Sequence, residues 1–470
     1  MSHHELVFRT ARELVLLMVT RQASAREVLE AHLEQIERVN PAVNAVVTLA
    51  PEHARKAAAR ADAAIVRGVR LGPLHGLPVL HKDLAATAGI RTTQGSVIFK
   101  DDVPASNHLV VQRLVDAGAV TMGKTNTPEF GTGSQTCNQV FGATRNPYDT
   151  NTTCGGSSGG AAVALACRMT PIADGSDMAG SLRNPASFCN VVGLRPSIGR
   201  VPAWPSPHTH FTLATYGAMA RTVGDVALQM QVIARPDDRA VLNAPVVDFT
   251  HPLEGGVAGT RVAWSTTLGG LPVDARITET LAPAVSVLEG LGCHVEEREP
   301  DFSGADESFS ILRAAYYRQA FKQLHEEWPR DIGEQTTWEI ERGLALTIDD
   351  LGRAELLRSQ VYDRMYAFFT AYRFLIAPVT QLPPFDVHEH WPKAVAGVPQ
   401  TFYREWMRIC SRVTLAGLPA ISVPFGFTAE GHPTGLQIIG RQGDDLGVLR
   451  MAAAVETATG TWQQHPHIAQ

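Results

Sequence analysis

Lysine is scarce in this chain of 470 residues, and six of its 41 basic residues are lysines, with arginine supplying the rest. The net charge of −6 argues against a partner such as nucleic acid or an anionic membrane, which would favour a basic surface.

Six cysteines form no CxxC pair, so the sequence offers weak support for a metal site or a disulfide framework and predicts free thiols. No apolar run approaches the ~18–20 residues of a membrane-spanning helix. The run 14–19 is also too short for a signal peptide, so we expect a cytoplasmic protein.

Residue composition divides the chain into four segments. Segment 1–70 predicts helices around one strand: Ser24 and Glu27 form a capping box that opens a helix over 25–39, and Pro41 is expected to stop it. A strand over 43–49 and an alanine-rich helix ending near Gly68 follow. We expect this segment to pack on the core.

Segment 71–235 alternates short apolar runs with helical patterns, which predicts an α/β architecture with a buried sheet. Segment 236–400 is expected to be a variable, largely helical part on the substrate side, and 401–470 returns to the α/β core. The predicted strands are 77–80, 120–122, 191–194, 261–264, 293–297, 374–377, 420–424 and 435–440. The predicted helices are 109–117, 161–166, 277–291, 308–372 as one long helical region, and 446–458.

Aromatic residues gather in the helical region 308–372, among them Phe309, Tyr316, Tyr317 and Phe321. Aromatic side chains on helices bury large apolar areas, so we favour a core role for them over a role in covering a pocket.

Four glycines surround Ser157 and Ser158 in the stretch 154–160, and an alanine-rich helix follows at once. One interpretation is a phosphate-binding nest at a helix N-terminus. The other is a loop that presents a serine hydroxyl to a reacting group. The phosphate interpretation predicts GxxxxGK[ST] or GxGxxG, and the stretch contains neither.

Ser181 lies in a second turn of small residues, where backbone N–H groups can converge on an oxyanion. A serine needs a base, and the Gly-x-Ser-x-Gly pattern of α/β hydrolases is absent around Ser181. His208 and His210 lie in a proline-rich loop and are expected at the surface. Lys82 follows an apolar strand, where burial would favour the neutral amine, a competent base. An ion pair with Asp83 at the strand end is the alternative, and the residues alone leave the two open.

Several motifs together resemble the amidase signature family of serine hydrolases. The lysine lies in PVLHKDL (78–84), the first serines in GGSSGG (155–160), and Ser181 in GSDMAGSLRNPA (175–186). Flanking stretches also match: GKTNTPEFG (123–131), VGLRP (192–196), AGLPAISVP (416–424) and GLQIIG (435–440). The resemblance covers about 10–235 and about 372–458. It implies one large α/β domain with a mixed central sheet and helices on both faces.

The resemblance implies a catalytic triad of Ser181 as nucleophile, Ser157 as bridging serine and Lys82 as base. The peptide bond before the bridging serine, here Gly156–Ser157, is cis in the family. The oxyanion would be held by the backbone N–H groups of Met178, Ala179, Gly180 and Ser181. Ser158, Asp177 and Arg183 are expected to support the lysine and the loop.

Three positions depart from the usual family pattern. Ala179 stands where glycine is frequent, and its methyl group is expected to narrow the acyl site. Ser176 stands where threonine is common and keeps a hydroxyl. His81 replaces an aliphatic residue, and we favour a space-filling role over contact with substrate.

The expected function is hydrolysis of a carboxylic amide, with a hydrophobic or aryl substrate favoured, and with esterase or carbamate-hydrolase side activity. No cofactor and no metal are required, the partner is a small-molecule amide, and homodimer formation is left open. One alternative is the glutaminase subunit of a tRNA-dependent amidotransferase, which needs glutamine and a partner protein. A non-enzymatic binding module is disfavoured, because Lys82, Ser157 and Ser181 are all present.

Overall fold

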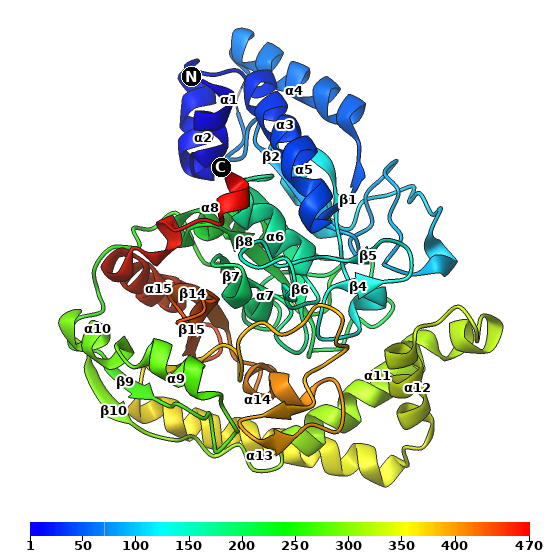
Figure 1. Ribbon diagram of the computed structural model, residues 1–470, viewed down its shortest axis with the longest axis vertical. Helices are drawn as coiled ribbons and strands as arrows, with labels where there is room; N and C mark the ends of the chain where they lie inside the picture. Colours follow the sequence, from blue (N-terminus) through cyan, green and yellow to red (C-terminus); the bar gives the residue numbers. More distant parts are fainter. Residues whose placement is uncertain (70) are drawn as a thin grey trace.

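A mixed β-sheet runs through the centre of the protein (Figure 1). The computed structural model describes residues 1–69 and 71–470, and eleven strands of that part form the sheet in the order β1-β3-β2-β6-β8-β7-β14-β15-β11-β9-β10. Strands β3, β2 and β6 are parallel, as are β11, β9 and β10, and the remaining neighbours are antiparallel. The predicted α/β fold with a mixed sheet is confirmed. The strands are β1 Val46–Leu49, β2 Pro78–Lys82, β3 Val120–Thr125, β6 Ile172–Asp177, β7 Val192–Arg195, β8 Thr215–Ala220, β9 Arg261–Trp264, β10 His294–Glu297, β11 Phe374–Pro378, β14 Ala420–Phe427 and β15 Pro433–Gly440. Two separate short pairs are β4 Cys137–Asn138 with β5 Gly142–Ala143, and β12 Ala394–Val395 with β13 Val398–Pro399.

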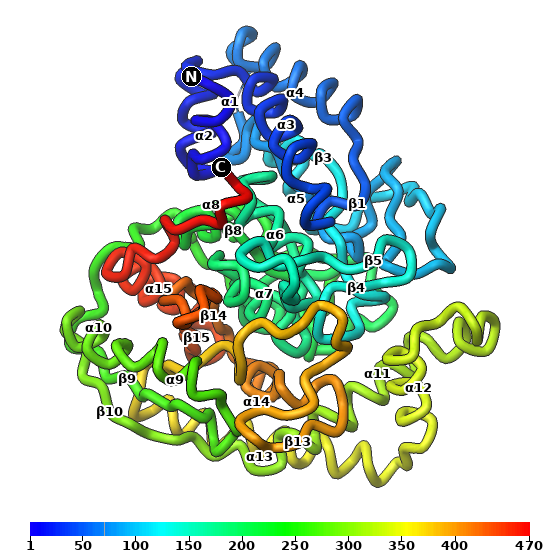
Figure 2. Tube along the Cα trace, viewed as in Figure 1, coloured from blue at the N-terminus to red at the C-terminus, as the bar shows by residue number. Residues whose placement is uncertain are grey.

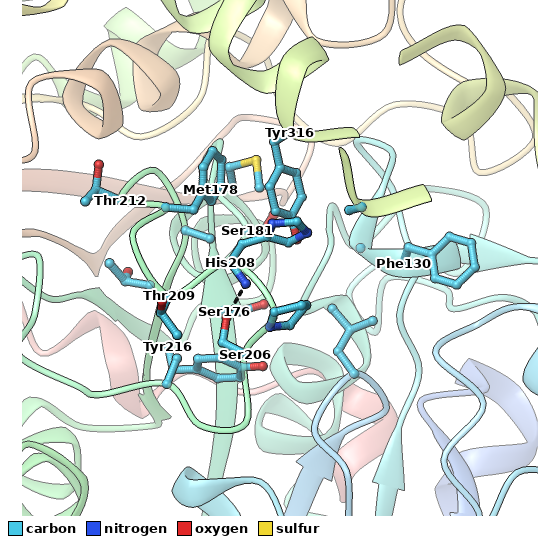
Figure 3. Close-up of a pocket in the computed structure, with 18 of the residues that line it drawn as sticks. Phe130, Ser176, Met178, Ser181, Ser206, His208, Thr209, Thr212, Tyr216 and Tyr316 are labelled. Carbon is cyan, nitrogen blue, oxygen red and sulfur yellow. Dashed lines mark hydrogen bonds between the residues drawn. The ribbon is translucent and has the colours of Figure 1, made fainter. Parts of the chain in front are cut away.

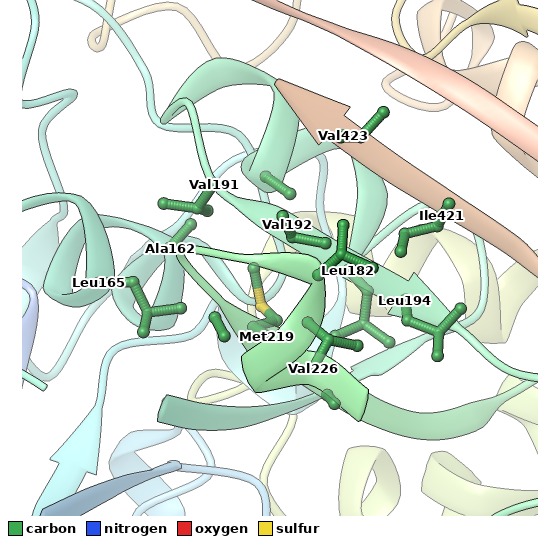
Figure 4. Close-up of a cluster of buried hydrophobic side chains, with 14 of the residues drawn as sticks. Ala162, Leu165, Leu182, Val191, Val192, Leu194, Met219, Val226, Ile421 and Val423 are labelled. Atoms are coloured by element: carbon green, nitrogen blue, oxygen red, sulfur yellow. The ribbon is translucent and has the colours of Figure 1, made fainter. Parts of the chain in front are cut away.

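Helices cover both faces of this sheet. α6 (Gly159–Ala166) and α7 (Arg183–Phe188) contact each other and the central strands, while α8 (Val223–Ile233) and α15 (Asp445–Thr459) form another contacting pair. Small residues let α6 pack closely against the backbone that follows β3, because a Cβ at Gly160 would lie only 2.4 Å from the backbone nitrogen of Asn126. Figure 4 shows part of the resulting core, which contains buried Leu165 of α6, Val226 of α8 and Met219 of strand β8. Burial of these apolar side chains is the main stabilising contribution to the sheet–helix packing.

The N-terminal helices lie together at one end of the molecule, beside the C-terminus (Figure 2). The predicted capping box is confirmed, since Ser24 Oγ accepts the Glu27 N–H and the Glu27 carboxylate accepts the Ser24 N–H. The stop at Pro41 is wrong. A proline in the last turn removes a single backbone hydrogen bond, so the helix continues to Val43 and the strand starts three residues later than predicted. The helices here are α1 His3–Phe8, α2 Ala11–Val19, α3 Ala25–Val43, α4 Pro51–Val66 and α5 Leu109–Asp116.

Segment 236–400 is divided more finely than predicted. The single helix over 277–291 is wrong, because it breaks at Pro283 into α9 (Ala275–Leu281) and α10 (Ala284–Gly290). The long helical region contains α11 (Ala305–Glu327), α12 (Glu334–Leu344) and α13 (Ile348–Ala371), with α14 (Arg408–Leu415) packing on α11. Among the helices of the described residues, none is long and apolar enough to cross a membrane.

Candidate active site

The sequence-predicted lysine and serines meet where two neighbouring parallel strands end. β2 and β6 are adjacent, so their carboxyl ends meet at one edge of the sheet. Lys82 is the last residue of β2, and Ser176 and Asp177 end β6. Ser157 and Ser158 come directly before α6. Crevices at the carboxyl ends of strands are the usual sites in α/β folds.

The Lys82 amine is buried among three serine hydroxyls. Its Nζ lies 2.7 Å from Ser157 Oγ, 2.9 Å from Ser158 Oγ and 3.2 Å from Ser176 Oγ, and the residue is 1% exposed. An ion pair with Asp83 is therefore the wrong interpretation, because that carboxylate accepts hydrogen bonds from Thr93 instead. Burial lowers the pKa of Lys82 to about 7, although the charges of Asp177 and Asp174 oppose this shift. A substantial neutral fraction of the amine is thus present at neutral pH.

Ser157 and Ser181 both line one cavity and belong to loops that are tied together. The Gly156–Ser157 peptide bond is cis, as the resemblance implied. The Ser158 N–H donates to the Ser181 carbonyl at 3.1 Å. Gly180 has a φ of +112°, and a Cβ there would lie 2.6 Å from the Cβ of Cys410, so the turn before Ser181 accepts only glycine.

The turn that carries Ser181 is held by a buried ion pair. The Asp177 carboxylate accepts two hydrogen bonds from Arg183, through Nε at 3.0 Å and Nη2 at 2.9 Å, and both side chains are fully buried. It also accepts the N–H groups of Gly180 and Leu182 at 2.9 and 3.1 Å. Of the four N–H groups expected to hold an oxyanion, that of Gly180 is therefore already engaged. Those of Met178, Ala179 and Ser181 stay the candidates.

Replacing Asp177 with asparagine is expected to destabilise the fold by about 3–5 kcal/mol, because Arg183 would be left as a buried, uncompensated charge. Burial alone would raise the pKa of the Asp177 carboxyl, but the Arg183 guanidinium holds it well below its usual range. Its stabilisation is therefore present at neutral pH and is lost as the pH falls through the folded-state pKa. Urea unfolding at neutral and acidic pH measures both effects.

Asp445→Asn provides the matched control for this prediction. Asp445 is buried and pairs with Arg200 at 2.9 Å in another part of the molecule, so both variants should lose stability. Only Asp177→Asn should also lose turnover, because Asp177 holds the turn that carries Ser181. Equal stability of Asp177→Asn and the wild type would contradict the role assigned to the ion pair.

His81 precedes Lys82 on β2, is fully buried and does not line the cavity. Its Nδ1 is 2.5 Å from Asp174 Oδ1, and its Nε2 is 3.0 Å from Thr121 Oγ1. The other Asp174 oxygen accepts the backbone N–H of Lys82 at 3.3 Å. The favoured space-filling role is thus confirmed, and the ring also anchors the carboxylate that holds the strand of Lys82.

The cavity has a volume of about 420 Å³, and aromatic side chains from several segments of the chain form its walls (Figure 3). Loop 201–212 supplies Phe211, whose ring stacks on Tyr316 of α11 with centroids 4.2 Å apart. Phe321 of α11 stacks on Phe130 at 4.6 Å. The core role favoured for the helical aromatics is therefore wrong for Tyr316, Tyr317 and Phe321, which line the cavity, while Phe309 is buried in the core.

His208 also lines the cavity, contrary to the expected surface position, whereas His210 is exposed. The proline-rich loop has one side in solvent and the other over the site, where the His208 ring meets Tyr316 edge-on at 5.2 Å. No local pattern in the sequence indicates which side each histidine faces.

The cavity lining carries little charge. Among the described residues that line it, none is aspartate or glutamate, and Arg313 is the one arginine or lysine. Burial lowers the pKa of His108 to about 4, so this lining residue is neutral at physiological pH. In the described part of the chain, no group of three or more histidine, cysteine or acidic side chains is arranged to hold a metal ion.

Sequence reasoning missed Arg313 and the hydrogen bond from Lys82 to Ser176. Arg313 and Tyr317 lie one helical turn apart and line the cavity together with Tyr316. The sequence shows this spacing, but it does not show that loop 201–212 lies opposite α11 and closes a cavity there.

Comparison with known proteins places these features in a family. The model of the Amidase family matches residues 27–449. An acylamidase of Rhodococcus erythropolis is 35% identical, covering 97% of this chain and 96% of that protein. A subunit of the glutamyl-tRNA(Gln) amidotransferase of Geobacillus kaustophilus is 34% identical, covering 97% of this chain and 98% of that protein. The solved structure of a bacterial aryl acylamidase of the amidase signature family superposes with a TM-score of 0.92 at 31% identity, over 98% of both chains.

Proposed function

The chain belongs to the amidase family of amide-hydrolysing enzymes, and from that premise we propose that it cleaves uncharged amides with an apolar, aryl-bearing body through an acyl-enzyme on Ser181. The observation that carries the proposal is the distance of 2.7 Å between the buried Lys82 amine and the Ser157 hydroxyl. Ser157 and Ser181 line the same cavity. A base within hydrogen-bond reach and with a pKa near neutrality meets the requirements of proton transfer.

The reaction begins with the neutral amine of Lys82. The amine accepts the hydroxyl proton of Ser157, and the Ser157 oxygen accepts the proton of Ser181 as Ser181 Oγ attacks the carbonyl carbon. Ser158 and Ser176 keep the amine oriented, because each lies within hydrogen-bond distance of Nζ. Lys82 as base, Ser157 as bridge and Ser181 as nucleophile thus act as one relay.

Attack forms a C–O bond and places negative charge on the former carbonyl oxygen. The backbone N–H groups of Met178, Ala179 and Ser181 are the proposed donors to this oxyanion, since that of Gly180 is bonded to Asp177. Ser157 then gives its proton to the leaving nitrogen and takes a proton back from the Lys82 ammonium, the C–N bond breaks and the amine departs. Water attacks the acyl-enzyme by the same relay, releasing the acid and restoring the Ser181 hydroxyl.

The cavity favours this substrate class over glutamine. Sequence identity does not separate the two, because this chain is about equally similar to the acylamidase and to the amidotransferase subunit. Arg313 would pair with the α-carboxylate of glutamine, but the α-ammonium group would be buried beside aromatic walls, and the lining offers it no carboxylate among the described residues. An unpaired buried ammonium is costly, whereas an aryl group gains from the same surface.

A panel of an aliphatic amide, an aryl anilide, an aryl ester, a carbamate and glutamine tests the proposal. We expect the anilide to be hydrolysed with a kcat/KM at least about tenfold above that of the aliphatic amide, because the apolar ring adds buried area in the cavity. Glutamine should give no turnover. Turnover of glutamine alone would contradict the proposal and favour the amidotransferase function, and ligand binding without any turnover would favour the binding module.

A further inference from the structure

A buried positive charge lies in the cavity wall, and the relay does not use it. Arg313 of α11 is 3% exposed and lines the cavity. Its Nε pairs with Glu339 Oε1 at 2.8 Å, and the Nε of Arg404 approaches the same oxygen at 2.7 Å. Glu339 is fully buried, so two guanidinium groups share one carboxylate. This cluster of Arg313, Glu339 and Arg404 carries a formal charge of +1.

The hydrogen bonds of Arg313 leave one side of its guanidinium poorly satisfied. Nη2 donates to the hydroxyls of Tyr317 and Tyr403, both at 2.9 Å. Nη1 faces Met178, and its partner there is the thioether sulfur at 2.8 Å. A thioether is a weak acceptor, so the two N–H groups of Nη1 on this buried cation have no strong acceptor among the residues that the structure describes. Met178 and Arg313 both line the cavity, and Met178 precedes Ser181 by three residues.

We propose that Arg313 is a specificity-determining residue that donates a hydrogen bond from Nη1 to an oxygen acceptor on the substrate. This inference rests on the proposed function and deepens it, because it names an oxygen-bearing subclass of the apolar amides. The excess charge of the cluster favours an oxygen acceptor with partial negative charge, and the flexible Met178 side chain can give way to it. The Glu339 carboxylate fixes the guanidinium, so the donor is oriented before substrate binds.

Two pairs of substrates, each differing by one oxygen, test this role. Butyryl and methoxyacetyl para-nitroanilide differ in the acyl part, and para-ethylacetanilide and para-methoxyacetanilide differ in the amine part. In one of the pairs, Arg313→Met should lower kcat/KM for the oxygen-bearing member by about tenfold or more, through KM, and change the hydrocarbon member by less than about threefold. Arg313→Lys, which keeps a charged donor, should retain part of the preference.

Arg404→Met is the matched control. It removes the same charge from the same carboxylate, but Arg404 does not line the cavity. We expect this variant to affect both members of each pair equally. An equal effect of Arg313→Met on both members of both pairs would overturn the inference.

Binding of the same four compounds to the inactive Ser181→Ala variant, with and without Arg313→Met, separates this inference from the proposed function. A selective loss of affinity for an oxygen-bearing compound supports the role of Arg313 even where the wild type fails to hydrolyse anilides. Equal affinities for the members of each pair, with Arg313 present, would overturn it without affecting the assignment of Ser181.

Discussion

Replacement of Ser181 with alanine is expected to lower amide hydrolysis by about ten-thousand-fold or more, because it removes the hydroxyl that we propose forms the acyl-enzyme. The fold should persist, since Ser181 contributes its backbone carbonyl, and not its hydroxyl, to the hydrogen bond with Ser158. Initial rates on the best substrate of the panel, together with thermal unfolding, measure both quantities.

A covalent probe gives this prediction a second readout. A fluorophosphonate should label the wild type once, on the peptide that contains Ser181, and should not label the variant. Ser422→Ala is the control for loss of a buried serine hydroxyl, because Ser422 lies on β14 and its Oγ has no hydrogen-bond partner among the described residues. Full activity of Ser181→Ala would exclude Ser181 as nucleophile.

The second large effect is expected for Lys82→Met, which should reduce kcat/KM by about a thousand- to ten-thousand-fold, since a positioned general base contributes up to that range. Methionine keeps an unbranched side chain of similar length and removes the amine that bonds Ser157, Ser158 and Ser176.

The pH profile distinguishes loss of a base from simple loss of packing. Because the amine acts in its neutral form, wild-type kcat/KM should rise with pH through about 7, the pKa to which burial lowers Lys82. Lys82→Met should lose this inflection. Lys124→Met removes another buried lysine, from the neighbouring strand β3, where burial lowers the pKa to about 8. The Lys124→Met control should keep the inflection near pH 7. An inflection near pH 7 that persists in Lys82→Met would contradict the assignment of Lys82 as base.

Elements with a strong local signal were predicted well from the sequence. The α/β class, the strand over 261–264 and the capping box of α3 follow from local residue patterns, whereas the mixed central sheet was implied by the family resemblance. The errors at Pro41 and Pro283 show the limit of such signals. A proline near a helix end is tolerated, while a proline inside a long periodic stretch divides it, and the pattern alone does not locate the helix end.

The candidate site also contains residues that local motifs identify and contacts that they do not. Lys82, Ser157 and Ser181 belong to short motifs and could be named in advance. Residue patterns alone left the partner of the lysine open between Asp83 and a serine, and the family resemblance pointed to Ser157 and Ser158. The third partner, Ser176, was missed because this contact depends on how β2 lies against β6. His208 and Arg313 face the cavity because segments about a hundred residues apart meet across it, and no local pattern in the sequence contains that information.

The proposed relay and the cavity walls lie on parts of the chain that differ in how many neighbouring elements pack against them. Lys82 and Ser176 end central strands of the sheet, whereas loop 201–212 and α11 form the outer wall. A substitution on a central strand disturbs the neighbouring strands and the helices packed on them. A substitution at a cavity-facing position of Tyr316 or His208 meets mainly other wall residues. Divergence toward new substrates can therefore proceed in the walls by small steps, each at low cost in folding stability, while the hydrolytic chemistry stays unchanged.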